Sequence, residues 1–497
     1  MARFPLAARS APTSGPILPI AGGPKLRPPA ARGLIVLSLA LLLAGCSAGQ
    51  ARIEGAPPQD PPLPAGIQVA FNQGGLHRYR SPVSGRWRRG DDLEAMILAA
   101  IQGARREILV AVQELSLPRV AMALVEAQRR GVQVRVVLED TYSTPWSRLS
   151  ATDRATLPPH QRRRIAQMEA LGQGDAVAML LDGGVPLIDD RADGSSGSGL
   201  MHHKFLVADR RLVVSGSANF SASCIHGDPD DPSSRGNVNH LLRFESPQLA
   251  ALFAAEFGRM WGDGPGGLSD SRFGLGKGGG AAQRVRIGAT SVEVLFAPHR
   301  RSDAGNGLAW LEQQLAGVRR RLDLALFVFS AQNLADALAT LHRQGVAIRL
   351  LADPGFAARP FSEVLDLLAI SQPDHRCRIE AGNNPWQQAH DGVGTPRLAG
   401  GDKLHHKFAV LDGRSVISGS FNWSPSAAHQ NDEVLLRIDS PLLAAHFSAE
   451  VDRMWQGAEL GVTARLERRL QRSRLACGRG QAREGPPASP STINHRT

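Results

Sequence analysis

The sequence of this 497-residue chain contains a long internal repeat. MHHKFLVADRRLVVSGSANFS begins at Met201, LHHKFAVLDGRSVISGSFNWS begins at Leu404, and 13 of the 21 residues match. The likeness extends outward, because each half has similar apolar and amphipathic segments before the motif and a segment ending in Arg-Met-Trp after it. A duplication of this extent predicts two similar domains rather than one large core.

The segments that precede the motifs predict the fold class. Residues 108–140 and 322–353 each read as a strand, an amphipathic helix closed by Gly131 or Gly345, and a second strand ending in an acidic residue. This βαβ pattern favours parallel strands joined by a crossover helix. We therefore expect an α/β protein of two pseudo-symmetric domains, each a mixed, largely parallel sheet flanked by helices, with one shared active site at their interface.

Composition and the ends of the repeat predict the domain boundaries. The first half carries extra residues on both sides of its motif, which indicates loop insertions in one common fold. The expected order is a signal peptide (1–45), a stalk (46–65), a first domain (66–261), a flexible Gly-rich linker (262–283), a second domain (284–456) and a basic C-terminal tail (457–497), with residues 476–497 disordered.

The N-terminal segment predicts export. Its apolar core, residues 34–44, is too short to span a bilayer comfortably, and Leu-Ala-Gly-Cys ending at Cys46 resembles a bacterial lipobox. We expect Cys46 to carry lipid and to anchor the protein on the periplasmic side or at the outer membrane; a buried helix or an uncleaved anchor is the alternative. The net charge of +11 resides mainly in the two ends, which leaves a nearly neutral body.

The other cysteines do not indicate a disulfide framework. Cys224, Cys377 and Cys477 have no CxxC spacing, so they indicate neither a zinc site nor a set of disulfides. We expect ordinary thiols, and one bridge stays open in an oxidising compartment.

Alternation along the repeated strands brings polar side chains together. His202 and Lys204 share one face of the first motif strand, and Ser217 and Asn219 share a face of the strand that returns from the turn. The second copy repeats the arrangement with His405, Lys407, Ser420 and Asn422. A lone histidine of this kind is often structural, but packing alone rarely requires a repeated, buried pair of His and Lys.

Two such clusters suit a phosphodiester. One neutral imidazole can attack phosphorus while a protonated imidazole donates to the leaving oxygen, and the Lys and Asn side chains would stabilise the developing charge. A metal is disfavoured, because His202 and His203 face opposite ways on a strand and neither copy has Asp, Glu or Cys at ligand spacing. We expect no cofactor, and a monomer, because both half-sites lie in one chain.

The two motifs resemble the HxKx4Dx6GSxN signature of the phospholipase D superfamily, and the likeness extends over residues 67–456. The resemblance implies phosphodiester cleavage or transfer through a phosphohistidine, without a required metal. It makes His202 the nucleophile and His405 the general acid, although pseudo-symmetry also permits the reverse. By the same resemblance the phosphate is held by Lys204, Lys407, Asn219 and Asn422, supported by Ser217 and Ser420, whereas Asp209 and Asp412 are structural.

Members of that family usually give each histidine an acidic partner. Glu433, in the segment QNDEVLL after the second motif, is expected in that role for His405. In the first half the aligned residue is Asn239, which can orient a ring but cannot balance its charge. Asp230 follows His202 by the same interval as Glu433 follows His405, and is a possible substitute from a loop.

Three functions remain in competition. The first is hydrolysis or transfer of phospholipid head groups at a membrane surface by a phospholipase D-like enzyme, with cardiolipin-synthase-like transfer as a variant of the same chemistry. The second is a nuclease of the same superfamily, favoured by the arginines near the C-terminus and disfavoured by the neutral body and 5% aromatic residues. A solvated C-terminal helix, or one that rests on anionic head groups, explains these arginines at least as well as DNA binding. The third is an inactive binding protein that retains the fold.

Overall fold

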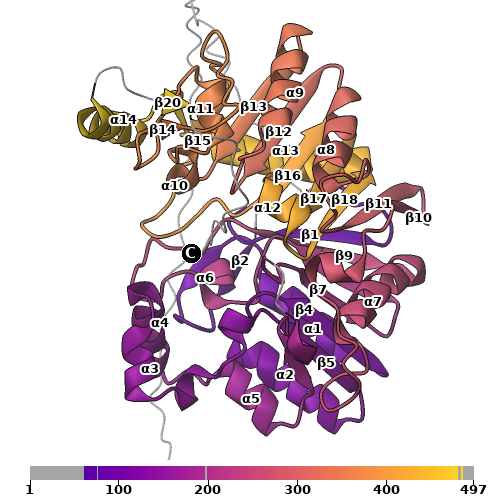
Figure 1. Cartoon of the computed structure of the whole chain (residues 1–497). Coiled ribbons are helices and arrows are strands. Elements are labelled where there is room, and N and C mark those ends of the chain that lie inside the picture. Colours follow the sequence, from indigo (N-terminus) through magenta and orange to yellow (C-terminus); the bar gives the residue numbers. More distant parts are fainter. Residues whose placement is uncertain (1–60, 75–76, 196–198, 479–482, 485–497) are drawn as a thin grey trace, which may run out of the picture. The chain divides into compact units, whose positions relative to one another are not determined.

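The computed structural model describes residues 61–74, 77–195, 199–478 and 483–484 (Figure 1). The predicted signal peptide, the lipidation site at Cys46 and most of the stalk lie outside these residues. No helix in this described part combines the length and the apolar character that crossing a bilayer requires.

Each half of the repeat forms its own sheet. The seven-stranded first sheet has the order β1 (Ile67–Phe71), β9 (His240–Glu245), β8 (Leu212–Gly216), β7 (Lys204–Ala208), β4 (Glu107–Val112), β5 (Gln133–Leu138) and β6 (Leu187–Asp189). The nine-stranded second sheet has the order β10 (Gln283–Ile287), β11 (Thr290–Ala297), β18 (Glu433–Asp439), β17 (Ser415–Gly419), β16 (Lys407–Leu411), β12 (Arg321–Leu326), β13 (Ala347–Ala352), β15 (Val393–Thr395) and β19 (Glu459–Leu460). Two short ribbons add β2 (Arg78–Arg80) with β3 (Trp87–Arg89), and β14 (Arg378–Ile379) with β20 (Arg483–Glu484).

The predicted βαβ units are present. Strand β4 leads into α2 (Pro118–Arg129) and returns as β5 parallel to it, and β12, α9 (Gln332–Arg343) and β13 do the same in the second half. Gly131 and Gly345 follow the two helices with φ of 86° and 83°, a left-handed conformation that glycine adopts without steric cost. The sequence pattern therefore located these units correctly.

The sheets are mixed, as expected, but the prediction that they are largely parallel is wrong. The parallel pairings are β4–β5, β5–β6, β12–β13 and β13–β15, and the other pairings within the two sheets are antiparallel. The cause is the motif itself, because each copy forms a hairpin, β7–β8 or β16–β17, that pairs antiparallel with the βαβ unit. The closing strands β9 and β18 extend that antiparallel part.

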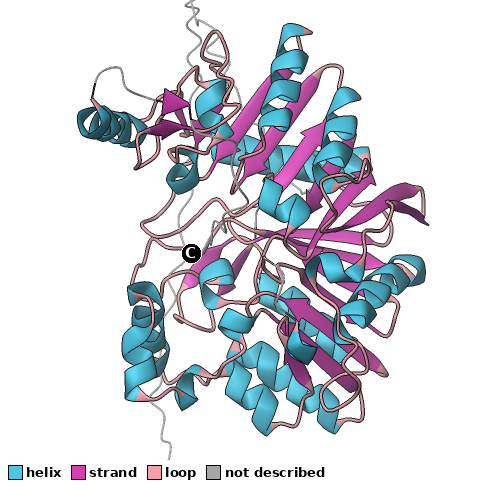
Figure 2. Ribbon diagram, in the orientation of Figure 1, coloured by secondary structure: helices cyan, strands magenta, loops and turns pink. Residues whose placement is uncertain are grey.

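Helices cover the sheets, and three apolar cores result (Figures 1 and 2). Helices α1 (Leu93–Gly103) and α2 pack with the first sheet, whereas α8 (Gly307–Ala316) and α9 pack with the second. A core shared by both halves contains α7 (Pro247–Trp261) and α13 (Pro441–Trp455). The remaining helices are α3 (Ala151–Thr156), α4 (Pro159–Ala170), α5 (Ala176–Asp182), α6 (Ala222–Ile225), α10 (Pro354–Ala357), α11 (Glu363–Leu367), α12 (Pro425–His429) and α14 (Ala464–Cys477).

The segment expected to be a flexible linker is packed against both halves. The side chain of Lys277 is 3% exposed, and its Nζ forms ion pairs with Glu256 on α7 and with Asp432, the latter at 2.6 Å. Composition predicts flexibility from glycine content, but a buried cation between two carboxylates fixes this part of the chain.

The C-terminal region contains a helix, which is one of the alternatives that the sequence leaves open for the basic tail. Part of the predicted basic tail forms α14, and Cys477 at its end is joined to Cys377 by a disulfide. The expectation of ordinary thiols is therefore wrong for this pair, because the fold brings together cysteines that are 100 residues apart in sequence. Cys224 is a buried thiol.

Candidate active site

The two motifs form the hairpins that the sequence predicts. Asp209 and Asp412 stand in the turns with φ of 53° and 52°. The Asp209 carboxylate accepts backbone N–H groups of Arg105, Arg106 and Glu107, and the Asp412 carboxylate accepts those of Arg319, Arg320 and Arg321. These aspartates thus tie each hairpin to the start of the central strand β4 or β12.

Short β-bridges connect the start of each motif to a segment of the other half. The backbone N–H of His202 donates to the carbonyl of Asp432 at 3.0 Å, and the N–H of His405 donates to the carbonyl of Val238 at 3.0 Å. Parallel bridges join Met201 to Asp432 and Val238 to Leu404. Each histidine therefore enters the site beside the segment that leads into the closing strand of the other half.

This exchange overturns the expected pairing of the histidines. Nδ1 of His202 lies 2.7 Å from Oε1 of Glu433, and Nδ1 of His405 lies 2.9 Å from Oδ1 of Asn239. Glu433 is thus the partner of His202, not of His405, and the Nδ1 partner of His405 is an amide rather than a carboxylate. Asp230 instead accepts a hydrogen bond from Gln167 on α4.

The two motif serines hold these partners. The Ser217 hydroxyl donates to Oδ1 of Asn239 at 2.9 Å, and the Ser420 hydroxyl donates to Oε2 of Glu433 at 2.6 Å. Each serine therefore orients the group that binds the histidine of the opposite half. A partner fixed in this way sets the tautomer and the orientation of the ring.

Both lysines are buried. Nζ of Lys204 donates to the carbonyl of His202 at 2.7 Å, and Nζ of Lys407 donates to the carbonyl of His405 at 2.8 Å. Burial lowers the pKa of Lys204 to about 8, and burial together with the charge of Lys204 holds the pKa of Lys407 well below its usual value. Two crowded ammonium groups favour an anion between them.

The electrostatics of the two imidazole sites differ. Burial, followed by repulsion from Lys407 and Lys204, holds the pKa of His405 well below its usual value. Burial raises the pKa of Glu433 to about 7, although Lys204 acts in the opposite direction. Both effects disfavour the protonated form of His405 in the empty site, and negative charge added there would favour it.

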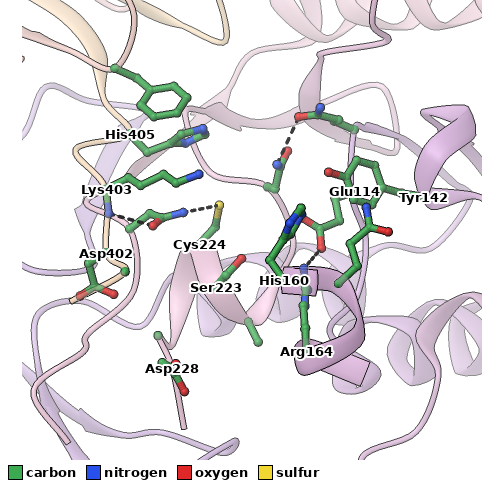
Figure 3. A pocket seen from close by; sticks show the side chains of 18 of the residues that line it. Glu114, Tyr142, His160, Arg164, Ser223, Cys224, Asp228, Asp402, Lys403 and His405 are labelled. Atoms are coloured by element: carbon green, nitrogen blue, oxygen red, sulfur yellow. Dashed lines mark hydrogen bonds and ion pairs between the residues drawn. The ribbon is translucent and has the colours of Figure 1, made fainter. Parts of the chain in front are cut away.

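One cavity of about 390 Å³ joins the two half-sites. Its lining includes His202, His405, Asn219 and Asn422, so residues from both motifs face a common space. Oδ1 of each of these asparagines is buried without a hydrogen-bond partner among the described residues, which leaves capacity for a bound group. Figure 3 shows the pocket with His405 and Lys403 on one side and Glu114, Tyr142 and Arg164 on the other.

The walls of the cavity are asymmetric, and sequence reasoning missed them. Gln113 accepts a hydrogen bond from Nζ of Lys204 at 3.3 Å and one from Asn219 at 3.3 Å. Its equivalent in the second half is Phe327, whose ring centre lies 4.8 Å from Nζ of Lys407 and 4.6 Å from the His405 ring. The aligned repeats differ at this position, and that difference was the signal available in the sequence.

An insertion of the first half supplies another wall. Helix α4 places His160, Arg163, Arg164 and Gln167 along the cavity. Arg164 forms an ion pair with Glu114, which follows β4. The sequence indicated loop insertions in this half, but not that one of them borders the site.

The histidine that follows His202 or His405 in each motif contacts a glutamate on a helix. Nε2 of His203 lies 3.2 Å from Glu256 on α7, and Nε2 of His406 lies 3.2 Å from Glu450 on α13. These contacts tie each motif to the closing helix of its own half. The matching Ala-Glu pairs of the two closing helices carried this signal in the sequence.

One group of possible metal ligands occurs in the described part of the chain. Glu139, Asp140 and Asp190 bring one oxygen each within 4.8 Å of one another. They do not line the cavity that the two motifs share.

The comparisons with known proteins agree with the repeat. A family model described as "Cardiolipin synthase, PLD-like domain" matches residues 97–261 and again 311–455. A mitochondrial cardiolipin hydrolase of Xenopus laevis is 29% identical over 175 residues, which cover 34% of this chain and 73% of that protein. The human mitochondrial cardiolipin hydrolase is 32% identical over 159 residues, covering 32% of this chain and 53% of that protein.

Solved structures give weaker likenesses. A phosphatidylserine synthase of Haemophilus influenzae matches with a TM-score of 0.48 and 14% identity, covering 79% of this chain and 87% of that one. Nuc of Salmonella typhimurium, a phospholipase D family member, matches with a TM-score of 0.26 and 22% identity, covering 40% of this chain and 95% of that one.

Proposed function

Because the chain belongs to the phospholipase D superfamily, we propose that it is a phosphodiesterase that hydrolyses or transfers phospholipid head groups through a phosphohistidine. The cardiolipin hydrolases among its relatives support a phospholipid substrate. Either water or an alcohol could serve as the acceptor in the second step.

The observation that carries this proposal is the shared cavity. His202 and His405 come from different repeats, line one space, and have Nδ1 held by Glu433 and Asn239, respectively. Because Nδ1 is held in each ring, the reaction is assigned to Nε2 on both. Lys204 and Lys407 supply the positive charge that a phosphate requires.

In the first step we assign attack to His202. Its Nε2 lone pair forms a bond to phosphorus, the bond from phosphorus to the leaving oxygen breaks, and that oxygen takes the proton from Nε2 of His405. The phosphorylated ring of His202 carries a positive charge, which the Glu433 carboxylate at 2.7 Å stabilises. This is the reason for placing the nucleophile beside Glu433 rather than beside Asn239.

In the second step His405 acts as a base. Its Nε2, now without the proton, accepts one from water or an alcohol, whose oxygen attacks phosphorus. The bond between phosphorus and Nε2 of His202 breaks, and the electron pair returns to the ring. The Asn239 amide suits this role, because His405 holds a charge only while an anionic substrate or product occupies the site.

We further propose that the protein is exported and tethered through a lipid on Cys46, as a monomer. The Cys377–Cys477 disulfide supports export, because such bonds persist mainly in oxidising compartments. Mass spectrometry of the membrane fraction tests the lipid, which a Cys46→Ser variant should lack.

The enzymatic proposal is tested with the purified chain in EDTA. Phosphatidylglycerol vesicles, plasmid DNA and bis(p-nitrophenyl) phosphate are offered separately, and we expect turnover of the lipid and of the aryl diester. His405→Asn should lower both rates by at least about 10³-fold, whereas exposed His375→Asn serves as the matched control. DNA nicking without lipid turnover would instead indicate a nuclease. No turnover of any of the three substrates would indicate a binding protein.

A further inference from the structure

A second cavity, here called the arginine groove, adjoins the catalytic cavity. Its volume is about 830 Å³, and the two cavities share Phe356, Gly401, Asp402 and Lys403. The rest of its lining comes from α10 and its flanking residues, from the end of β15 and the loop after it, from Glu459 of β19, and from the start of α14 with Thr463 before it. Figure 1 labels α10, β15 and α14. Neither the repeat nor the motifs account for this groove, because α14 lies beyond the second copy.

The groove is strongly cationic. Its lining includes Lys403, Arg359, Arg397, Arg465 and Arg468, and within the described part of the chain none of these forms an ion pair with a carboxylate. The four arginines are exposed, so their charges are available to a ligand. The rest of the folded body is close to neutral, which makes this concentration of unpaired charge a distinct feature.

Three carboxylates, Asp353, Asp402 and Glu459, offset part of this positive charge. Asp353 accepts backbone N–H groups of Gly355, Phe356 and Leu404. Asp402 accepts the Ser234 hydroxyl and the Arg235 N–H. Glu459 is exposed. The one lysine and four arginines of the lining outnumber its three carboxylates, so positive charge is in excess.

Helix α14 is firmly attached, so the groove is preformed. Leu466 and Leu470 are buried in the core of the second half, and the disulfide from Cys477 to Cys377 holds the end of the helix. Burial and then repulsion from Arg359 and Arg465 lower the pKa of Arg469 on the same helix. A fixed array of mutually repelling cations favours a bound anion.

Two exposed apolar side chains are close in sequence to residues of the groove lining, and a third lies farther along α14. Leu460 is 48% exposed and Val462 is 49% exposed. In sequence they lie between Glu459 and Thr463, which line the groove. Leu475, on α14, is 79% exposed. Arginines beside exposed aliphatic side chains are typical of surfaces that lie in the interface of an anionic bilayer.

A nucleic acid strand fits this lining less well. Strands are usually held by aromatic side chains on which bases stack. The Phe356 ring packs against Phe327 with centroids 4.6 Å apart, and the Arg359 guanidinium lies 5.7 Å from the Phe356 ring centre. That aromatic ring is therefore already engaged within the protein.

We propose that the arginine groove and these exposed apolar side chains dock the enzyme on an anionic phospholipid bilayer, with head-group phosphates seated among the arginines. This deepens the proposed function and rests on it for the identity of the substrate. Phe356 and Lys403 line both cavities, so the docked surface would lie next to the cavity that holds the histidines.

The test compares two charge-matched variants of the full chain. Arg465→Glu/Arg468→Glu alters the groove, whereas Arg286→Glu/Arg414→Glu alters two exposed arginines on β10 and in the β16–β17 turn. Flotation with phosphatidylglycerol-containing and phosphatidylcholine-only vesicles measures binding. Turnover of the lipid relative to turnover of bis(p-nitrophenyl) phosphate measures delivery of substrate to the site.

We expect the groove variant to bind phosphatidylglycerol vesicles at least ten-fold more weakly, and its ratio of lipid to soluble turnover to fall at least ten-fold. The control variant should stay within two-fold of the parent, and any contribution of residues 34–44 is the same in all three. Binding of the parent should weaken as salt rises from about 0.05 to 0.5 M, because surface charges are screened. Arg397→Gln, a milder change in a loop, should weaken binding about three-fold even if the double variant is unstable.

Equal vesicle binding by parent, groove variant and Arg397→Gln would overturn the proposal. So would equal losses in the groove and control variants, or a groove variant that loses affinity for single-stranded DNA but not for vesicles. If the groove variant loses vesicle binding while the parent turns over no lipid, docking stands and the proposed substrate fails.

Discussion

Glu433 of the second half lies 2.7 Å from the Nδ1 of His202 in the first half. The reciprocal contact, from Asn239 to His405, is a neutral amide at 2.9 Å. Each histidine therefore depends on the other repeat for its orientation, and the two Nδ1 partners differ in charge. This difference between two otherwise matching half-sites is the reason why we assign different chemical roles to the two rings.

Replacing Asn239 with aspartate should widen the pH range of the enzyme. A carboxylate at Nδ1 stabilises the imidazolium, so the pKa of His405 rises and the general acid stays protonated to higher pH. We expect the alkaline limb of the kcat profile to move up by about one pH unit. A rate profile identical to that of the parent would contradict the assignment of His405 as the acid.

Binding of a phosphate analogue should be coupled to proton uptake. In the empty site His405 and Lys407 have lowered pKa values, and that of Lys204 is about 8. A bound anion raises these pKa values, so at pH 8 the protein should take up protons when vanadate or inorganic phosphate binds. Calorimetry in buffers of different ionisation enthalpy measures the number of protons taken up per ligand bound. A value of zero would show that the lysines are already fully charged.

Asp412→Ala should reduce stability rather than chemistry. The carboxylate accepts three backbone N–H groups at the start of β12, and loss of such charged hydrogen bonds costs about 2–3 kcal/mol. We expect a lower midpoint of urea unfolding with kcat within about three-fold of the parent. Those hydrogen bonds hold the pKa of Asp412 below its usual value, so its contribution is present above the unfolded pKa and fades as pH falls through the folded pKa. A loss of kcat comparable to that of His405→Asn, with unchanged unfolding, would make Asp412 catalytic.

Removal of the disulfide should act locally. Cys477→Ser releases the end of α14, so amide exchange should accelerate over residues 464–477 before any change occurs in the strands of the second sheet. Cys224→Ser, which alters a thiol outside the bond, is the control for loss of sulfur. Uniform acceleration across both sheets would mean that the bond stabilises the whole fold and not this helix.

The sequence was sufficient to predict the structural features that occur in both repeats. Alternation and spacing placed the βαβ units and the two hairpins, because these depend on segments that are neighbours along the chain. The same logic failed for Glu433, which follows the second motif in sequence but contacts His202 of the first. The bridges from Met201 to Asp432 and from Val238 to Leu404 show the exchange, and no local pattern encodes a contact between residues that far apart in the chain.

The other missed features are also long-range. Lys277 lies in a glycine-rich stretch, yet it is buried between Glu256 and Asp432, and composition says nothing of such a partner. The Cys377–Cys477 bond spans 100 residues, and the arginine groove combines side chains from three separate segments. Features that join distant segments were the ones that the sequence left open.

The identity of the residue that carries phosphorus decides between this mechanism and its alternatives. In rapid-quench experiments with a phosphodiester that has a good leaving group, at a pH where the phosphoramidate survives, mass spectrometry should find the adduct on His202. It should accumulate in His405→Asn, because that variant lacks the base for the second step. An adduct on His405 in His202→Asn would reverse the roles, and the absence of any histidine adduct from a turning-over parent would contradict the proposed mechanism.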